Sequence, residues 1–201
     1  MVKVGFICEG ECERIMIESD AFQDLLKRLN LDCVFPIKDA NGNGNLLPHN
    51  IQIHLAMLTD AGAEKIIILT DLDADACTTN TKNRITKNGA HKIDNGIIIV
   101  AVKELEAWYL ADNVAMSNLL KKNHSVDNPQ NFDNPMKGLS DIHLAHTGRG
   151  LGVDSKGAKP RVTRKILEAG FSIENAAKHP NCASAAYFLN KLSKISITTP
   201  S

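Results

Sequence analysis

Aromatic side chains are scarce in this chain of 201 residues, which has one tryptophan, two tyrosines and six phenylalanines. Proteins that hold single-stranded nucleic acid by stacking present aromatic side chains to successive bases, so we do not expect a stacking platform here. A surplus of charge is missing as well, because 23 Lys and Arg residues balance 23 Asp and Glu residues. A polyanionic partner would therefore have to be held by a local basic patch or through a metal ion, since no overall positive field attracts it.

Long apolar runs and paired cysteines are also absent. No apolar run approaches the roughly 20 residues that a membrane-spanning helix needs. The first segment, MVKVGFICEG, lacks the separate charged and small-residue zones of a signal peptide, and we expect a cytoplasmic protein that does not enter a membrane. The five cysteines are odd in number and form no C-x-x-C motif, which favours reduced thiols over disulfides.

The first 112 residues alternate between strand-like and helical patterns. Continuous apolar segments predict strands at 2–8, 32–37, 65–70 and 96–102, and helical periodicity predicts helices at 11–29, 47–58 and 104–112. Continuous apolar strands that alternate with helices indicate an α/β fold, a Rossmann-like parallel sheet with helices on both faces. Such sheets place their functional sites at the carboxyl ends of the strands.

The remainder of the chain has a different composition. Residues 113–152 are rich in Asn, Pro, His and Gly, and we expect an insertion or lid with little regular structure there. Helices are predicted at 160–170, 173–178 and 183–192. We therefore expect an α/β core over residues 1–112, with the insertion and a helical C-terminal extension over 113–201 belonging to the same domain.

The clearest candidate motif is Thr70-Asp71-Leu72-Asp73-Ala74-Asp75, which directly follows the predicted strand 65–70. In an extended segment, carboxylates at alternate positions point to the same side. Carboxylates so close together repel one another, and a hard cation such as Mg²⁺ or Mn²⁺, which prefers oxygen ligands, would relieve the repulsion. We expect Asp71, Asp73 and Asp75 to be metal ligands, and the alternative is a solvated acidic turn that caps the next helix.

Two further acidic segments follow predicted strands. Glu9 ends the first strand, and the glycine after it permits a tight turn, so we expect Glu9 at the same edge of the sheet as Asp71. Glu104 and Glu106 follow the fourth strand and cannot both face the same way on a helix, and we favour Glu106 as a further metal ligand. In both segments the alternative is an acid in the first turn of a helix, where it favours the helix dipole.

Basic residues gather ahead of and within the predicted helix 160–170; they are Arg149, Lys156, Lys159, Arg161, Arg164 and Lys165. Arg161, Arg164 and Lys165 share one helical face, since they are spaced by three and four residues. They are expected to contact the phosphates of a nucleic acid, because Arg and Lys supply most backbone contacts. The alternative is a solvated helix face.

The segments Glu9-Gly10 and Asp71-Leu72-Asp73-Ala74-Asp75 resemble the two signatures of the TOPRIM domain. That domain occurs in type IA and type II topoisomerases, bacterial primases and OLD-family nucleases. The resemblance covers residues 1–112 and implies that Glu9 acts as general acid or base, that Asp71 and Asp73 hold Mg²⁺, and that Asp75 is a further ligand. The insertion at 113–152 and Cys8, where an aliphatic residue is common, depart from the family pattern.

Three other segments resemble a narrower set of small bacterial TOPRIM-like proteins, some of which are encoded beside an ATPase in antiphage systems. The segments are 104–112 (ELEAWYLAD), Ser155-Lys156-Gly157, and Cys182-Ala183-Ser184 with Phe188-Leu189. On this resemblance Lys156 is a second candidate catalytic residue, an AAA- or ABC-type ATPase is a candidate partner, and a second copy of the chain is another.

The resemblance implies a Mg²⁺- or Mn²⁺-dependent nuclease that hydrolyses phosphodiester bonds in DNA or RNA, the effector of a bacterial antiviral defence system. The metal would polarise a phosphoryl oxygen and lower the pKa of an attacking water, and Glu9 would transfer a proton.

Two other functions remain open. A haloacid-dehalogenase-like phosphatase also ends a strand with D-x-D and uses the first aspartate as nucleophile, but here the motif follows the third strand and Asp75 stands where Thr or Val is usual. The other is a non-catalytic TOPRIM-like subunit that binds a partner.

Overall fold

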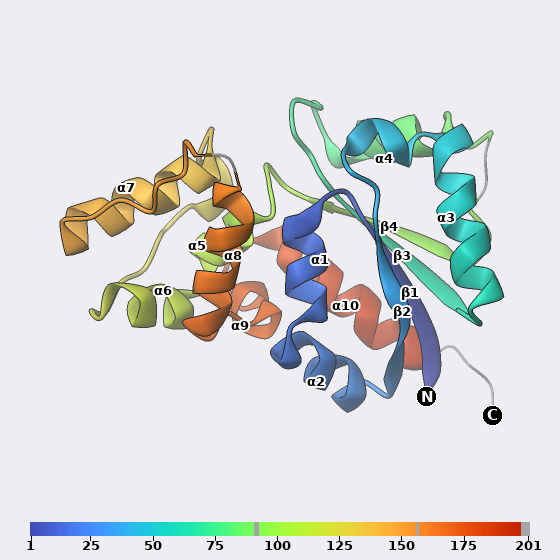
Figure 1. The fold of residues 1–201 in the computed structure, drawn as a ribbon, viewed down its shortest axis with the longest axis horizontal. Coiled ribbons are helices and arrows are strands. Elements are labelled where there is room, and N and C mark those ends of the chain that lie inside the picture. The colour runs from blue at the N-terminus through green and yellow to red at the C-terminus, as the bar shows by residue number, and fades with distance from the viewer. Residues whose placement is uncertain (91–92, 156, 198–201) are drawn as a thin grey trace. The chain divides into compact units, whose positions relative to one another are not determined.

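The structure, a computed structural model, describes residues 1–90, 93–155 and 157–197. In this part of the chain four strands form one sheet in the order β2-β1-β3-β4 (Figure 1). The strands are β1 (Val2–Cys8), β2 (Leu31–Asp39), β3 (Lys65–Asp71) and β4 (Gly96–Ala101). β1 pairs in parallel with both β2 and β3. The predicted α/β fold, a parallel sheet flanked by helices, is confirmed.

Helices cover both faces of the sheet, as continuous apolar strands require. α1 (Glu11–Glu18) and α2 (Asp20–Arg28) lie on one side of the strands, and α3 (Pro48–Asp60) and α4 (Thr78–Thr86) lie on the other (Figure 1). Phe6 of β1 packs edge to face on Phe22 of α2, with ring centroids 5.9 Å apart. Ile7 joins Leu58 of α3 and Ile85 of α4 in a buried cluster. Neighbouring residues of β1 therefore contribute to opposite cores, because side chains alternate along a strand.

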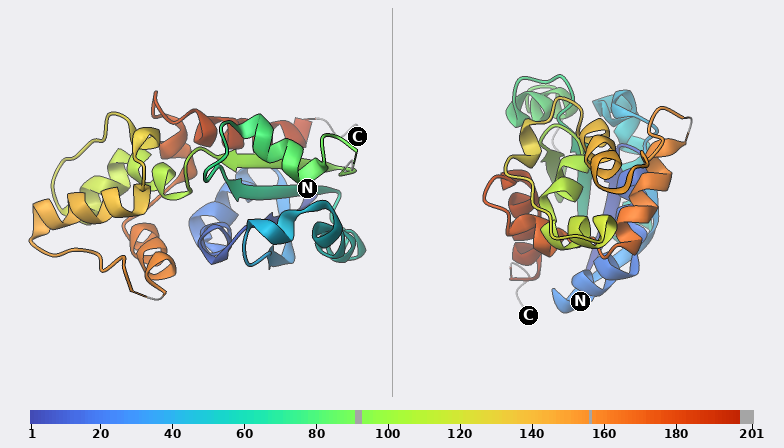
Figure 2. Two further views of the ribbon diagram at one scale, coloured as in Figure 1. Left: turned by 90° about the horizontal axis from the view of Figure 1, so that it is seen from above. Right: turned by 90° about the vertical axis from the view of Figure 1, so that its left-hand side faces the viewer.

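The chain divides into two compact units. The first unit comprises residues 1–100 and 190–201, and the second comprises residues 101–189. The second unit contains α5 (Glu106–Ala111), α6 (Asn113–Leu120), α7 (Pro135–Thr147), α8 (Ala158–Glu168), α9 (Ile173–Ala177) and the first part of α10 (Ala183–Ile197) (Figure 2). Within the described residues, none of the helices combines the length and the apolar character needed to cross a bilayer.

The predicted boundary after residue 112 differs from this division. α5 lies before that boundary, but it packs against α6, α7 and α9 of the second unit. An apolar helix has the same sequence pattern whichever core buries it, so the pattern of residues 104–112 could not assign α5 to a unit.

Two predictions of local structure are wrong, and one helix was not predicted. The single helix expected at 11–29 is divided at Ser19, whose side chain accepts a hydrogen bond from the backbone N–H of Phe22 and so caps α2. No helix was predicted between the strands at 65–70 and 96–102, but α4 lies there. Residues 113–152 contain α6 and α7, whose first turns are capped by the side chains of Asp112 and Asn134. Asp and Asn favour loops in composition, but they are also strong N-caps, and here they start helices.

Candidate active site

Glu9 lies at the end of β1 with its backbone fixed on both sides. Its N–H donates to the carbonyl of Leu69 on β3 (2.9 Å), and its carbonyl accepts from the N–H of Gly42 after β2 (2.8 Å). The side-chain Oε2 accepts hydrogen bonds from Thr70 Oγ1 (2.5 Å) and from the backbone N–H of Asp71 (3.1 Å). The carboxylate that ends β1 is therefore held against the end of β3.

Asp71 ends β3, and Asp73 lies within the turn that follows the strand. Asp71 is the last residue of β3 and is 9% exposed. Asp73 has a φ of 50°, in the left-handed region that aspartate tolerates better than most residues, and the N–H of Asp75 donates to the carbonyl of Leu72 (3.0 Å). The expectation of an extended segment with three carboxylates on one face is therefore wrong, because the strand ends at Asp71 and the next residues turn.

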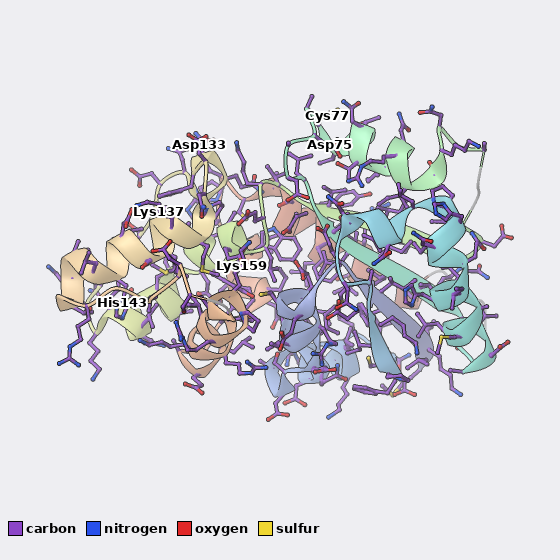
Figure 3. All side chains as sticks on the ribbon, turned by 45° about the horizontal axis from the view of Figure 1, so that its top comes forward. Asp75, Cys77, Asp133, Lys137, His143 and Lys159 are labelled. Atoms are coloured by element: carbon purple, nitrogen blue, oxygen red, sulfur yellow. The ribbon has the colours of Figure 1, made fainter. Side chains whose placement is uncertain are left out.

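The side chains of Asp73 and Asp75 each accept hydrogen bonds from neighbouring segments. Asn43, which follows β2, donates from Nδ2 to Oδ2 of Asp73 (3.0 Å). Asp75, on the loop before α4 (Figure 3), accepts from Thr81 Oγ1 (2.9 Å) and forms an ion pair with Arg84 Nη2 (3.3 Å). The loops after β2 and β3 are therefore joined at Asp73, and Asp75 joins its loop to α4. The metal-ligand roles of these aspartates stay predictions.

The surroundings of Glu9 raise the pKa of its carboxyl group above the ordinary value. Burial is the largest cause, and the negative charge of Asp73 acts in the same direction. The hydrogen bonds from Thr70 and Asp71 and the positive charge of Arg84 lower the pKa but do not cancel the effect of burial. A raised pKa brings a carboxyl group closer to neutral pH, where a general acid or base is most effective.

The residues at this edge fit a divalent cation by the chemistry of their donor atoms. Carboxylate oxygens are the preferred ligands of Mg²⁺ and Mn²⁺, and the charge of Asp73 is near enough to Glu9 to contribute to its raised pKa, although burial is the largest cause. In the described part of the chain, no group of three or more His, Cys, Asp or Glu side chains is arranged to hold a metal ion. In the structure, Glu9 and Asp73 are instead engaged in hydrogen bonds with Thr70, the backbone of Asp71, and Asn43.

Glu106 belongs to the second unit, where it begins α5 and is 1% exposed. Lys159, near the start of α8 (Figure 3), lies with Nζ 3.7 Å from Oε1 of Glu106 and 3.2 Å from Oε2 of Glu104. Burial raises the pKa of Glu106 to about 7, Lys159 opposes this rise, and Glu104 adds to it. Glu106 is therefore a buried carboxyl group with a lysine beside it, and its role as a metal ligand stays a prediction.

The predicted nucleic-acid-binding residues lie on α8, where Arg161, Arg164 and Lys165 are all exposed. Arg161 folds back along the chain, and its Nη2 donates to the carbonyls of Leu151 (3.1 Å) and Gly152 (3.0 Å). Arg161 therefore stabilises the segment that precedes α8 by these hydrogen bonds. Lys156, the second candidate catalytic residue, lies outside the described residues.

Several residues of the narrower resemblance form the interior of the second unit. Trp108 stacks on Phe188 with ring centroids 5.5 Å apart, and its Nε1 donates to Ser184 Oγ (2.8 Å). The same hydroxyl accepts hydrogen bonds from the backbone N–H of Val102 and from Gln130 Nε2. Trp108, Ser184 and Phe188 therefore contribute to the stability of the second unit through ring packing and buried hydrogen bonds.

Sequence analysis did not single out two residues that contact the predicted acids, Asn43 and Arg84. A signal for Asn43 was available, because the Asn-Gly repeat at 41–45 follows the second strand at the same edge of the sheet. Arg84 gave no such signal, since it reaches Asp75 only through α4, a helix without a clear apolar period.

Comparison with known proteins adds one structural similarity. No family model matches the chain, and no curated protein matches it. Among solved structures, the C-terminal region of the Burkholderia pseudomallei OLD protein resembles it over 96% of this chain and 99% of that chain, with a TM-score of 0.49 and 15% sequence identity. What this chain does therefore has to be inferred from its own residues.

Proposed function

We propose that this protein is a divalent-metal-dependent nuclease with Glu9, Asp71 and Asp73 in its active site. The observation that carries the proposal is the contact between Glu9 Oε2 and the end of β3, made to Thr70 Oγ1 and to the N–H of Asp71. Two acids that are 62 positions apart in the chain meet at the carboxyl edge of the sheet, where α/β proteins bind their ligands.

Each residue of the proposed site has a distinct role. When bound, Mg²⁺ or Mn²⁺ would polarise a phosphoryl oxygen and lower the pKa of an attacking water. Asp71 and Asp73 would hold the ion through their carboxylate oxygens, and Asn43 orients the Asp73 carboxylate by its hydrogen bond. Glu9 would carry the proton, since burial raises its pKa toward the range in which a carboxyl group can both accept and release one.

The substrate would be the phosphate backbone of DNA or RNA, held in part by Arg164 and Lys165 of α8. An AAA- or ABC-type ATPase partner, a second copy of the chain and a role in antiviral defence belong to the same proposal. Co-purification of the chain with an AAA- or ABC-type ATPase would test the partner, and the phage sensitivity of cells that express both would test the role.

The direct test is the digestion of supercoiled plasmid and of tRNA with Mg²⁺, with Mn²⁺ and with EDTA. Glu9→Gln keeps an oxygen that can accept from Thr70 and Asp71 but removes the proton-transferring carboxyl group, and we expect activity to fall by about 100-fold or more. Glu18→Gln is the matched control, because Glu18 lies on α1 with a side chain that is 38% exposed, and it should cleave like the wild type.

A second readout is independent of catalysis. Binding of Mn²⁺, measured by electron paramagnetic resonance, should be lost when Asp71 and Asp73 are both changed to Asn and kept in Glu18→Gln. Cleavage that survives in EDTA or in Glu9→Gln would overturn the proposal. So would a wild type that is inert both alone and with its ATPase partner, which would indicate a non-catalytic subunit. A phosphorylated Asp71 trapped with a phosphate ester would indicate a phosphatase.

A further inference from the structure

A basic hollow lies in the first unit at the end of the sheet opposite to Glu9. It has a volume of about 280 Å³ and is lined by Lys65, Asn95, Gly96, Ile97, Lys191, Lys194 and Ile195. Lys65 begins β3 and Gly96 begins β4, whereas Asp71 ends β3. At about 3.3 Å for each strand residue, roughly 20 Å separates the hollow from Asp71. The hollow is therefore a separate feature from the acidic site.

Positive charges from two elements converge on this hollow. Lys191 and Lys194 are spaced by three residues on α10, so their side chains project from the same face of the helix. Lys65 comes from β3, and its Nζ donates to Oδ1 of Asn95 (3.2 Å), which fixes both side chains at the rim. No Asp or Glu among the described residues lines the hollow. Three cationic side chains around one cavity create a positive potential that attracts anions.

The rest of the lining narrows the class of anion. Lysine is a common phosphate ligand, acting as a point charge. Ile97 and Ile195 add an apolar wall to the hollow. Inorganic phosphate has no apolar surface to pack against this wall, whereas the sugar and base of a nucleotide do. The volume lies near the roughly 300 Å³ lower end of small-molecule sites, which suits a single nucleotide unit better than a larger ligand.

We propose that the hollow lined by Lys65, Lys191 and Lys194 binds the phosphate of a nucleotide unit. The unit is either a free nucleotide or part of a nucleic-acid strand, and the phosphate chemistry is the same in both. The site does not depend on hydrolysis at Glu9, and binding in EDTA tests it whether or not the chain is a nuclease.

The test compares two double variants with the same change in net charge. Lys191→Glu with Lys194→Glu reverses two positive charges at the hollow, while Lys27→Glu with Lys87→Glu reverses two exposed positive charges that do not line it. Lys191→Arg with Lys194→Arg keeps the charges. Affinities for inorganic phosphate, for AMP, and for a short single strand with or without a 5′-phosphate are measured by calorimetry in EDTA.

The hollow variant should bind at least about tenfold more weakly than the wild type, because it loses two charge-assisted hydrogen bonds to the phosphate and gains two negative charges that repel it. The control should change less than twofold, and the arginine variant should bind like the wild type. AMP binding identifies a free-nucleotide site, and binding of the strand alone identifies a strand contact. In the wild type, the ligand that binds should shift the amide NMR signals of Asn95, Gly96 and Ile97, a readout that needs no variant.

Two results would overturn the proposal. One is equal weakening in the hollow and control variants, which would indicate a diffuse charge effect. The other is the absence of binding by every probe to the wild type, together with unchanged amide signals at the hollow.

Discussion

Burial of Glu106 should make the stability of the second unit depend on pH, and Glu106→Gln should remove that dependence. The side chain is 2% exposed, and the neighbouring Lys159 Nζ lies 3.7 Å away, too weak a partner to offset the loss of hydration. The pKa of Glu106 is accordingly raised from 4.5 to about 7, with burial as the largest cause.

The sign of the effect follows from proton binding. A carboxyl group whose pKa is higher in the folded protein than in the unfolded chain binds more protons when folded. Its contribution to folding is therefore greatest at low pH, and stability falls as the pH rises from about 4.5 to about 7. At about 1.4 kcal/mol for each pH unit between the two pKa values, the loss amounts to about 3 kcal/mol.

The assay uses the single tryptophan of the chain. Trp108 lies on the same helix as Glu106 and is fully buried, so its fluorescence reports the unfolding of the second unit. Urea unfolding is followed between pH 4.5 and 8 for the wild type, Glu106→Gln and Glu168→Gln. Glu168 lies on α8 of the same unit and is exposed, so its variant controls for the loss of one carboxylate.

The free energy of unfolding of Glu106→Gln, relative to the wild type, should rise by about 3 kcal/mol across this range. A difference that stays constant with pH would refute the reasoning, because it would mean that Glu106 has the same pKa in the folded and unfolded chain. The same conclusion would follow if Glu168→Gln and Glu106→Gln behaved alike.

Two further predictions concern the acidic site and the interior of the second unit. The charges of Asp73 and Arg84 act on Glu9 with opposite signs, so Asp73→Asn should lower the pKa of Glu9 and Arg84→Gln should raise it, as measured by ¹³C NMR of the Glu9 carboxyl carbon. Shifts of the same sign in both variants would contradict the geometry of the site. Ser184→Ala leaves Trp108 Nε1 and the N–H of Val102 without their acceptor and should lower the free energy of unfolding by about 1–3 kcal/mol, as followed by tryptophan fluorescence. A loss no greater than that of Ser125→Ala, at an exposed position, would show that this hydroxyl does not stabilise the unit.

The sheet and its acidic edge could be predicted from the sequence because their signals are local. β1 and β3 are continuous apolar runs, and a strand buried on both faces has to have that pattern. Glu9 and Asp71 stand at the ends of these runs, and parallel strands bring their carboxyl ends to one edge. The fold class and the proximity of these two acids therefore follow from short stretches of sequence.

The tertiary structure decided how these acids are engaged and which charges they meet. The turn at Asp73 ends the row of carboxylates, and Arg84 reaches Asp75 through a helix without a clear period. Lys159 reaches Glu106 from a helix more than fifty positions away in the chain. Lys65 and Lys191 meet at one hollow from opposite halves of the sequence. Periodicity reports which face of an element is buried, but not which element buries it. Ion pairs and cavities depend on which elements pack together, and that is determined by packing over the whole chain.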